Sequence, residues 1–102
     1  MSGEAPPVRG WNALAIHPDD NVAVAIADIA SGTVVRVWRE GTVSELTAAQ
    51  PIALGHKVAL VDLVPGAAIT KYGETIGVAT APIAKGHHVH VHNLVSQRGR
   101  RT

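Results

Sequence analysis

Apolar residues in this chain fall into short runs of roughly four to seven, separated by turn-forming residues about every ten positions. The clearest turn signals are three dipeptides that contain glycine: Ser31-Gly32, Pro65-Gly66 and Lys85-Gly86. Strands of this length between tight turns are typical of a small all-β domain. We find no heptad or other internal repeat in the sequence.

Several runs can be assigned to elements. Residues 12–16 are expected to form a first strand, and residues 33–38 and 43–46 a hairpin around a turn at 39–42. Residues 22–29 are apolar except for Asp28, so a buried strand and a short helix both fit them. The pattern therefore predicts an all-β fold with at most one short helix.

The 102 residues suit a single domain. We predict this domain at 13–95, preceded by a flexible lead at 1–12 and followed by a basic, flexible tail at 96–102. The net charge of +1 argues against a large basic surface, so no nucleic-acid partner is expected. The absence of cysteine excludes a disulfide, a thiolate metal site and a cysteine nucleophile.

Targeting and phosphate-binding signals are also missing from the sequence. No apolar run approaches the ~18 residues of a membrane span, and no signal segment opens the chain, so we expect no membrane partner and a cytoplasmic protein. Glycine-rich phosphate loops and the GxSxG elbow of serine hydrolases are absent.

Histidine is concentrated near the end of the chain, where residues 86–93 hold four of the six histidines. On a strand, His88, His90 and His92 would share one face. His90 and His92 would then stand roughly 7 Å apart and could share a metal ion, whereas the roughly 13 Å from His88 to His92 would keep all three from one ion. An exposed, solvated histidine face explains the pattern equally well.

Two further clusters place ionisable side chains next to glycine at the start of a strand. They are Gly-His-Lys at 55–57 and Lys-Tyr-Gly-Glu at 71–74. Lys57 and Lys71 are suited to a substrate carboxylate, although Lys71 and Glu74 are also explained as a surface ion pair. Glu74 is a candidate metal ligand or base.

Four motifs now occur in a recognisable order and spacing. They are His17-Pro18-x-Asp20-Asn21-Val22-Ala23-Val24-Ala25, Gly55-His56-Lys57-Val58-Ala59-Leu60, Lys71-Tyr72-Gly73-Glu74-x-Ile76-Gly77-x-Ala79-Thr80 and Gly86-x-x-Val89-His90-x-His92-Asn93-Leu94. Together they resemble the N-terminal SAF domain of the altronate and galactarate dehydratase family, from about Ala13 to Leu94.

The resemblance implies a β-clip fold, which is a small, bent all-β unit. Full-length members of the family remove water from sugar acids with a divalent metal, typically Fe²⁺. The family also includes a two-subunit sulfolactate sulfo-lyase whose small subunit is a free-standing domain of this kind. This sequence stops at Thr102, before the large C-terminal domain of the dehydratases. We therefore expect the small subunit of a metal-dependent lyase, inactive alone and completed by a separate large subunit, that eliminates water or sulfite from a hydroxy acid or sugar acid such as altronate or galactarate.

Such an elimination requires a base, an acid and a positive group that stabilises the developing enediolate. Histidine suits proton transfer because its pKa lies near neutrality. We predict catalytic roles for His90, His92, Lys71 and Glu74, and metal ligation by His90 and His92. Substrate contacts are expected from His56, Lys57, Asn93, Asp20, Asn21 and Tyr72, with turn formation as a competing role for Asp20 and Asn21, and His87 and His88 are expected to be peripheral.

A non-catalytic module is one alternative, because β-clip SAF domains also occur in sialic-acid synthases, antifreeze proteins and pilus or flagellar assembly factors, and a piece of a longer enzyme is another. In a non-catalytic module, the histidines would only bind a sugar acid or pack against a partner. Exposed strand edges also make a homodimer of the isolated chain plausible.

Overall fold

Residues 10–96 are described by a computed structural model and contain strands and turns but no helix. The strands are β1 (Ala13–Leu14), β2 (Val22–Ala25), β3 (Val34–Arg39), β4 (Thr42–Thr47), β5 (Lys57–Ala59), β6 (Ala68–Lys71), β7 (Glu74–Ala79), β8 (His88–Val89) and β9 (Leu94–Ser96). The predicted all-β class is confirmed. The helix left open for residues 22–29 is not formed, because this run becomes β2 and an isolated bridge at Ile29.

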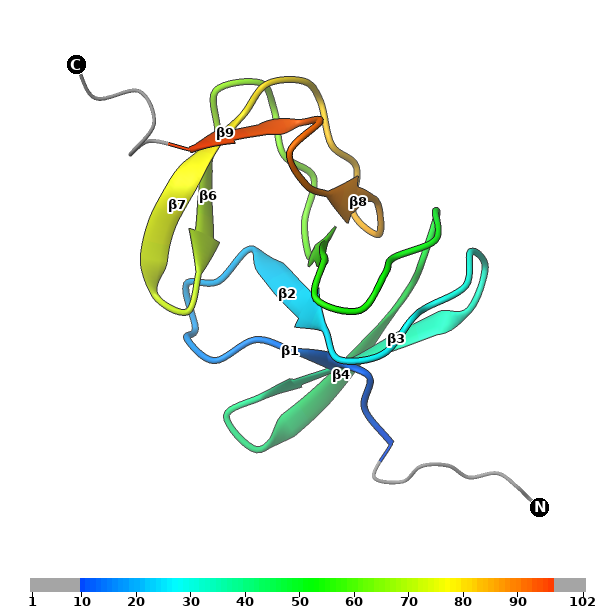
Figure 1. Cartoon of the computed structure of the whole chain (residues 1–102). Coiled ribbons are helices and arrows are strands. Elements are labelled where there is room, and N and C mark those ends of the chain that lie inside the picture. Colours follow the sequence, from blue (N-terminus) through cyan, green and yellow to red (C-terminus); the bar gives the residue numbers. More distant parts are fainter. Residues whose placement is uncertain (1–9, 97–102) are drawn as a thin grey trace.

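The strands form two sheets, one of six strands in the order β4-β3-β1-β2-β5-β8 and one of three in the order β6-β7-β9. Figure 1 shows the β3–β4 hairpin at one side of the molecule and the three-stranded sheet at the other. The expected β3–β4 hairpin is confirmed. Its two turn residues, Glu40 and Gly41, have φ of 52° and 82°, as a two-residue hairpin turn requires.

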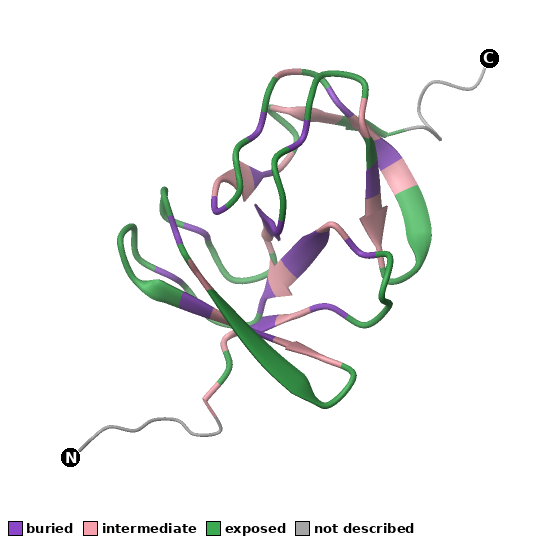
Figure 2. Ribbon diagram, turned by 180° about the vertical axis from the view of Figure 1, so that it is seen from behind, coloured by how far each residue is buried: buried purple, intermediate pink, exposed green. Residues whose placement is uncertain are grey.

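Two small apolar cores lie on opposite sides of the paired strands β2 and β5. Ala23 and Val58 face the first core, whereas Val22 and Ala59 face the second. Figure 2 shows β2 buried along most of its length. Because both faces of these strands are covered, their sequence is continuously apolar rather than alternating. This is why the apolar pattern alone did not separate strand from helix there.

An internal repeat that the sequence analysis did not find becomes clear in the structure. Four eight-residue segments share an Ile or Leu at position two, a glycine at position five and a Val or Ile at position eight: 28–35, 51–58, 62–69 and 82–89. The glycines Gly32, Gly55, Gly66 and Gly86 have φ between 85° and 88°. The residue at position eight of each segment is fully buried. Each segment is therefore a glycine turn that leads into a strand.

The repeats combine in pairs that divide the domain into two similar halves. Ile29 and Ile52 exchange backbone hydrogen bonds in the first half, and Leu63 and Ile83 do the same in the second. The β3–β4 hairpin of the first half corresponds to the β6–β7 hairpin of the second. The β6–β7 turn repeats the backbone of the β3–β4 turn, with φ of 56° at Tyr72.

The chain ends lie largely outside the described residues. The expected lead at 1–12 is described only from Gly10, and the expected basic tail at 96–102 only at Ser96. Asn12 already belongs to the folded domain, because its backbone N–H donates to Arg36 O at 2.9 Å and its side chain accepts from Arg36 N at 2.8 Å. Among residues 10–96, no helix is long and apolar enough to span a membrane.

Candidate functional site

The histidine-rich segment is a short strand followed by a tight turn. β8 ends at Val89, so the expected strand through residues 86–93 is wrong. Asn93 closes the turn, since its Nδ2 donates to His88 O and its Oδ1 accepts from His90 N, both at 2.9 Å. Its own N–H donates to His90 O at 3.0 Å. Asn93, predicted to bind substrate, thus holds the backbone between the histidines.

The turn brings together side chains that an extended strand would separate. The rings of His88 and His92 lie 5.0 Å apart, far closer than extended geometry predicts. His56, from the turn before β5, joins them, with its Nδ1 2.8 Å from Nε2 of His88 and its ring 3.8 Å from the ring of His90. His88, expected to be peripheral, is central to this group, while His92 lies exposed at its rim. We call His56, His88 and His90 the histidine cluster.

The donor atoms of the histidine cluster fit a divalent transition metal in type and spacing. One nitrogen from each ring lies within 4.8 Å of the other two. Three imidazoles are a common donor set for such metals. Buried Nδ1 of His90 has no hydrogen-bond partner among residues 10–96. Since that atom is not otherwise engaged, it is available to a ligand.

The present orientation of the imidazole rings must change before the histidine cluster can bind a metal ion. The rings of His56 and His90 are stacked, with 11° between their planes. An imidazole lone pair lies in its ring plane, so two stacked rings do not point at a common ion. The hydrogen bond between His56 and His88 must also open. The cluster therefore fits a metal after at least one ring has turned.

The surroundings of His88 and His90 favour the neutral form of these two side chains. Burial, followed by the neighbouring His92 and His56, lowers the pKa of His88. Burial and His56, with Lys57 next, lower the pKa of His90. Neutral imidazole is the form that binds metals.

Lys57 interacts electrostatically both with Lys71 and with two histidines, His88 and His90. Burial and the charge on Lys71 lower the pKa of Lys57. Lys57 in turn lowers the pKa of both His88 and His90. Lys57 thus lies close enough to Lys71 and to His88 and His90 to interact with all three electrostatically, and a positive charge there is suited to a carboxylate.

An open hollow adjoins the cluster on the first half of the domain. It measures about 530 Å³ and is lined by His56, His88 and residues 28–30 and 51–53. Its walls are mostly apolar, and Asp28, His56 and His88 are the ionisable residues that line it.

The β6–β7 turn carries the other predicted catalytic residues. Lys71 Nζ lies 5.3 Å from the centre of the Tyr72 ring. Tyr72 and Glu74 are exposed and line a separate hollow of about 430 Å³ with Lys71. In the described part of the chain, no ion pair joins Lys71 to Glu74, and Glu74 is not among the residues whose donor atoms group with the histidine cluster. The catalytic role of Glu74 stays a prediction.

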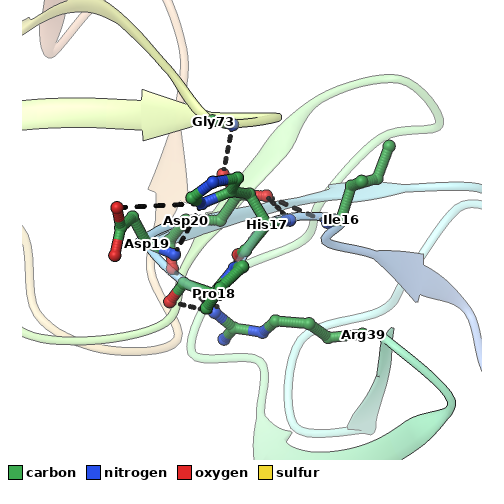
Figure 3. A network of polar contacts seen from close by, with 7 residues as sticks. All are labelled: Ile16, His17, Pro18, Asp19, Asp20, Arg39 and Gly73. Carbon is green, nitrogen blue, oxygen red and sulfur yellow. Dashed lines mark hydrogen bonds and ion pairs between the residues drawn. The ribbon is translucent and has the colours of Figure 1, made fainter.

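Asp20 is occupied by a structural network (Figure 3). Its carboxylate accepts the backbone N–H groups of Ile16 and His17 at 2.9 and 3.0 Å and that of Gly73 at 2.8 Å. The Arg39 guanidinium donates to the carbonyl of Asp20 at 3.2 Å and to two others of this loop. Burial alone would raise the pKa of Asp20, but the N–H donors outweigh it and lower that pKa. Asp20 thus ties the first loop to the β6–β7 turn.

Asn21 is bound in the same way. Its Oδ1 accepts from Thr70 N at 2.8 Å and its Nδ2 donates to Ala68 O at 2.9 Å, which covers the edge of β6. Both side chains thus have structural partners: Asp20 bonds its own loop, as the competing turn-forming role predicts, whereas Asn21 bonds the distant strand β6. A substrate contact by either side chain stays a prediction.

The role of His88 had a signal in the sequence. In the second and fourth repeats, positions six and seven hold His56 and Lys57, and His87 and His88. β5 and β8, which follow these positions, pair in antiparallel register with Val58 opposite His88. Recognition of the repeat would have shown that His56 and His88 occupy neighbouring positions of two equivalent turns, and the pairing of β5 with β8 then brings them together.

Comparison with known proteins agrees with this architecture. A family model described as the altronate/galactarate dehydratase SAF domain matches residues 11–97. The chain is 51% identical over 80 residues to altronate dehydratase of Escherichia coli (strain K12), which covers 78% of this chain and 15% of that enzyme. It is 31% identical over 83 residues to the (2R)-sulfolactate sulfo-lyase subunit alpha of Chromohalobacter salexigens, which covers 78% of this chain and 88% of that subunit.

The similarity to the dehydratases is thus confined to a small part of their length. Galactarate dehydratase (L-threo-forming) of Escherichia coli (strain K12) shows the same relation, at 36% identity over 75 residues and 13% of that enzyme. The match to the family model nevertheless includes every described strand and the whole histidine cluster. The chain belongs to the altronate/galactarate dehydratase SAF domain family.

Proposed function

We propose that this chain is the small component of a metal-dependent lyase that eliminates water or sulfite from a hydroxy acid, with an active site completed by a separate large subunit. The observation that carries the proposal is the histidine cluster with Lys57 at an open surface. Relatives named as dehydratases and as a sulfo-lyase subunit support the reaction class. The extent of the match supports the subunit arrangement, since 88% of a sulfo-lyase alpha subunit is covered.

In this proposal, the lysines and the histidines have different roles in the elimination. Lys57 and Lys71 would attract the substrate carboxylate, and His92, exposed at the rim of the cluster, would move a proton. His56, His88 and His90 would hold the metal, with His56 and His88 in place of His92 in the predicted ligand set. A bound divalent ion such as Fe²⁺ would stabilise the negative charge of an enediolate. The metal identity and the cytoplasmic location stay predictions.

Reconstitution tests this proposal. The purified chain should show no turnover of altronate, galactarate or sulfolactate by itself, and turnover with Fe²⁺ once a dehydratase-like large subunit is added. His90→Ala should weaken metal binding at least about tenfold, whereas the control His17→Ala, which alters an exposed loop residue, should leave it unchanged.

Three results would contradict the proposal. One is turnover by the chain alone, and another is full activity of the reconstituted His92→Ala pair. The third is metal-independent binding of the acid with no turnover in any pairing, which would support the non-catalytic binding module.

A further inference from the structure

Strand β4 is a long edge with nothing paired to its outer side. Five of its six residues are exposed, and Figure 2 shows it as an exposed ribbon along the β3–β4 hairpin. It contains no proline or lysine and its pairing with β3 has no bulge, so it lacks three of the features that prevent edge pairing, and Glu45 is its one charged residue.

The other edge strands of the described chain are shorter or covered. β6 is bonded along its edge by Asn21 and carries a bulge. β8 has two residues, and its backbone is bonded by Gln50 and Asn93. β9 has three residues.

The internal symmetry of the domain allows β4 to be compared with the corresponding strand of the second half. Its counterpart in the second half is β7, and the outer side of β7 is paired with the antiparallel strand β9. The described part of the first half has no strand in the corresponding position beside β4. An antiparallel strand from outside would restore the arrangement.

Hydrogen bonds show which backbone groups of β4 point outward. The carbonyl groups of Arg36 and Trp38 accept from Asn12 and Ala15, next to and beyond β1, so these two residues face β1. Their opposite residues in β4 are Glu45 and Val43. In an antiparallel pair, residues that do not bond to one neighbour point their N–H and C=O to the other side.

Val43 and Glu45 therefore direct backbone groups away from β3. Within residues 10–96, no hydrogen bond reaches these groups from elsewhere in the chain. In an antiparallel pair, every second residue of a strand bonds to the neighbouring strand. An added strand could therefore bond to both Val43 and Glu45, which lie on either side of Ser44.

We infer that two copies of this chain associate through β4, antiparallel, around a two-fold axis at Ser44. Val43 of each copy then lies opposite Glu45 of the other and exchanges two hydrogen bonds with it, which satisfies every outward group of both residues. Ser44 faces Ser44 of the second copy. The dimer extends the six-stranded sheet at the β4 edge and leaves β8, the opposite edge, free.

The position of Glu45 favours a two-fold axis at Ser44 over an axis at Val43 or Glu45. An axis at Glu45 would place two glutamates opposite each other, which is unfavourable. An axis at Val43 would leave Glu45 opposite the turn. With the axis at Ser44, each Glu45 lies opposite a valine and keeps its ion pair with Arg36 of its own chain.

A single cysteine tests the register, because the natural chain has none. The Cα atoms of facing Ser44 residues would lie about 4.5 Å apart, within the range of a disulfide. Ser44→Cys should thus form a covalent dimer under mild oxidation. The control Thr42→Cys, on the same exposed face, should not, because its two copies would stand roughly 14 Å apart. A Ser44→Cys chain that stays monomeric, or equal cross-linking of both variants, would overturn the inference.

A charge pair at Val43 gives an independent test by sedimentation equilibrium. In the Val43→Glu dimer, the new glutamate of each copy would lie opposite Glu45 of the other copy, so two pairs of like charges would face each other. The dissociation constant of this dimer should rise about tenfold relative to that of the natural chain. Val43→Lys places opposite charges there and should dimerise at least as tightly as the natural chain. A natural chain that is monomeric at millimolar concentration, or equal dimerisation of the two variants, would also overturn the inference.

Discussion

Asp20→Ala should strongly destabilise the domain. The Asp20 side chain is buried, with 5% of the residue exposed, and its carboxylate accepts three backbone N–H groups. Two of these donors lie in its own loop, and the third, Gly73 N, is 53 positions away in the β6–β7 turn. Loss of the carboxylate leaves all three donors without their acceptor and releases the loop from the turn.

The magnitude follows from these three bonds. A hydrogen bond to a charged group contributes about 1.5–3 kcal/mol, and three bonds that share one carboxylate contribute less than their sum. We expect a loss of about 3–4 kcal/mol, a large part of the roughly 5–15 kcal/mol by which small domains are stable. Asp20→Asn retains one acceptor oxygen and should lose about half as much.

Urea unfolding followed by the fluorescence of Trp11 and Trp38 measures these losses. Asp19→Ala is the matched control, because the adjacent Asp19 side chain is 81% exposed and its removal should change stability by less than about 0.5 kcal/mol. Equal midpoints for Asp20→Ala and Asp19→Ala at pH 7 would refute the argument. A substrate-binding role alone would reduce ligand affinity in Asp20→Asn without moving the midpoint.

The dependence on pH supplies a second check on the same residue. The pKa of Asp20 in the folded protein is below its ordinary value of 3.8. The carboxylate therefore contributes its full stabilisation above that value and loses it as the pH falls through the folded pKa. The stability difference between the natural chain and Asp20→Asn should shrink only below pH 3.8. A difference that shrinks near neutral pH would contradict the assigned shift.

Three further predictions concern the turns and the histidine cluster. Gly86→Ala should cost at least about 3 kcal/mol in urea unfolding, because its Cβ would lie 2.4 Å from a backbone oxygen of β4, whereas Gly32→Ala, with similar φ and open space, should cost about 1 kcal/mol. Asn93→Ala should weaken metal binding about tenfold by calorimetry, and Asn93→Asp, which keeps the acceptor for His90 N, should lose less; equal losses would contradict this role. The pKa values of His88 and His90 are lowered in the folded chain, so the metal-free chain should have their full contribution to stability above pH 6.5 and lose it as the pH falls through the folded pKa values. Urea midpoints that do not decline below pH 6.5 would contradict this, as would an equal decline in His90→Ala.

Local sequence signals predicted the fold class and the strongest hairpin. The β3–β4 hairpin has two β-rich runs and a glycine turn, and a two-residue turn sets which residues of the two strands lie opposite each other. β2 was ambiguous because its two faces contact different cores, and such burial depends on residues distant in sequence. The same limit explains why β1 is only two residues long although the apolar run there is longer.

The site was harder to predict because it depends on a single turn. An alternating histidine pattern predicts a strand, but the Asn93 side chain bonds the backbone of His88 and His90 and bends the chain. That bend brings His90 to His56, which lies 34 positions earlier, within stacking distance. Residue types in the sequence indicated imidazole and lysine side chains as candidates, and that chemistry stays a prediction, whereas the grouping of the rings required the tertiary structure.

The internal repeat explains why the chemistry is found at one place. All four repeats form the same glycine turn, but at positions six and seven the first and third hold Thr33, Val34, Ala67 and Ala68. Only the second and fourth carry ionisable side chains there, and the strands that follow these two, β5 and β8, are paired with each other. The strands after the first and third repeats, β3 and β6, lie in different sheets. Histidines at those positions would remain apart, so the β5–β8 pair is where the repeated turns bring equivalent positions together to form a site.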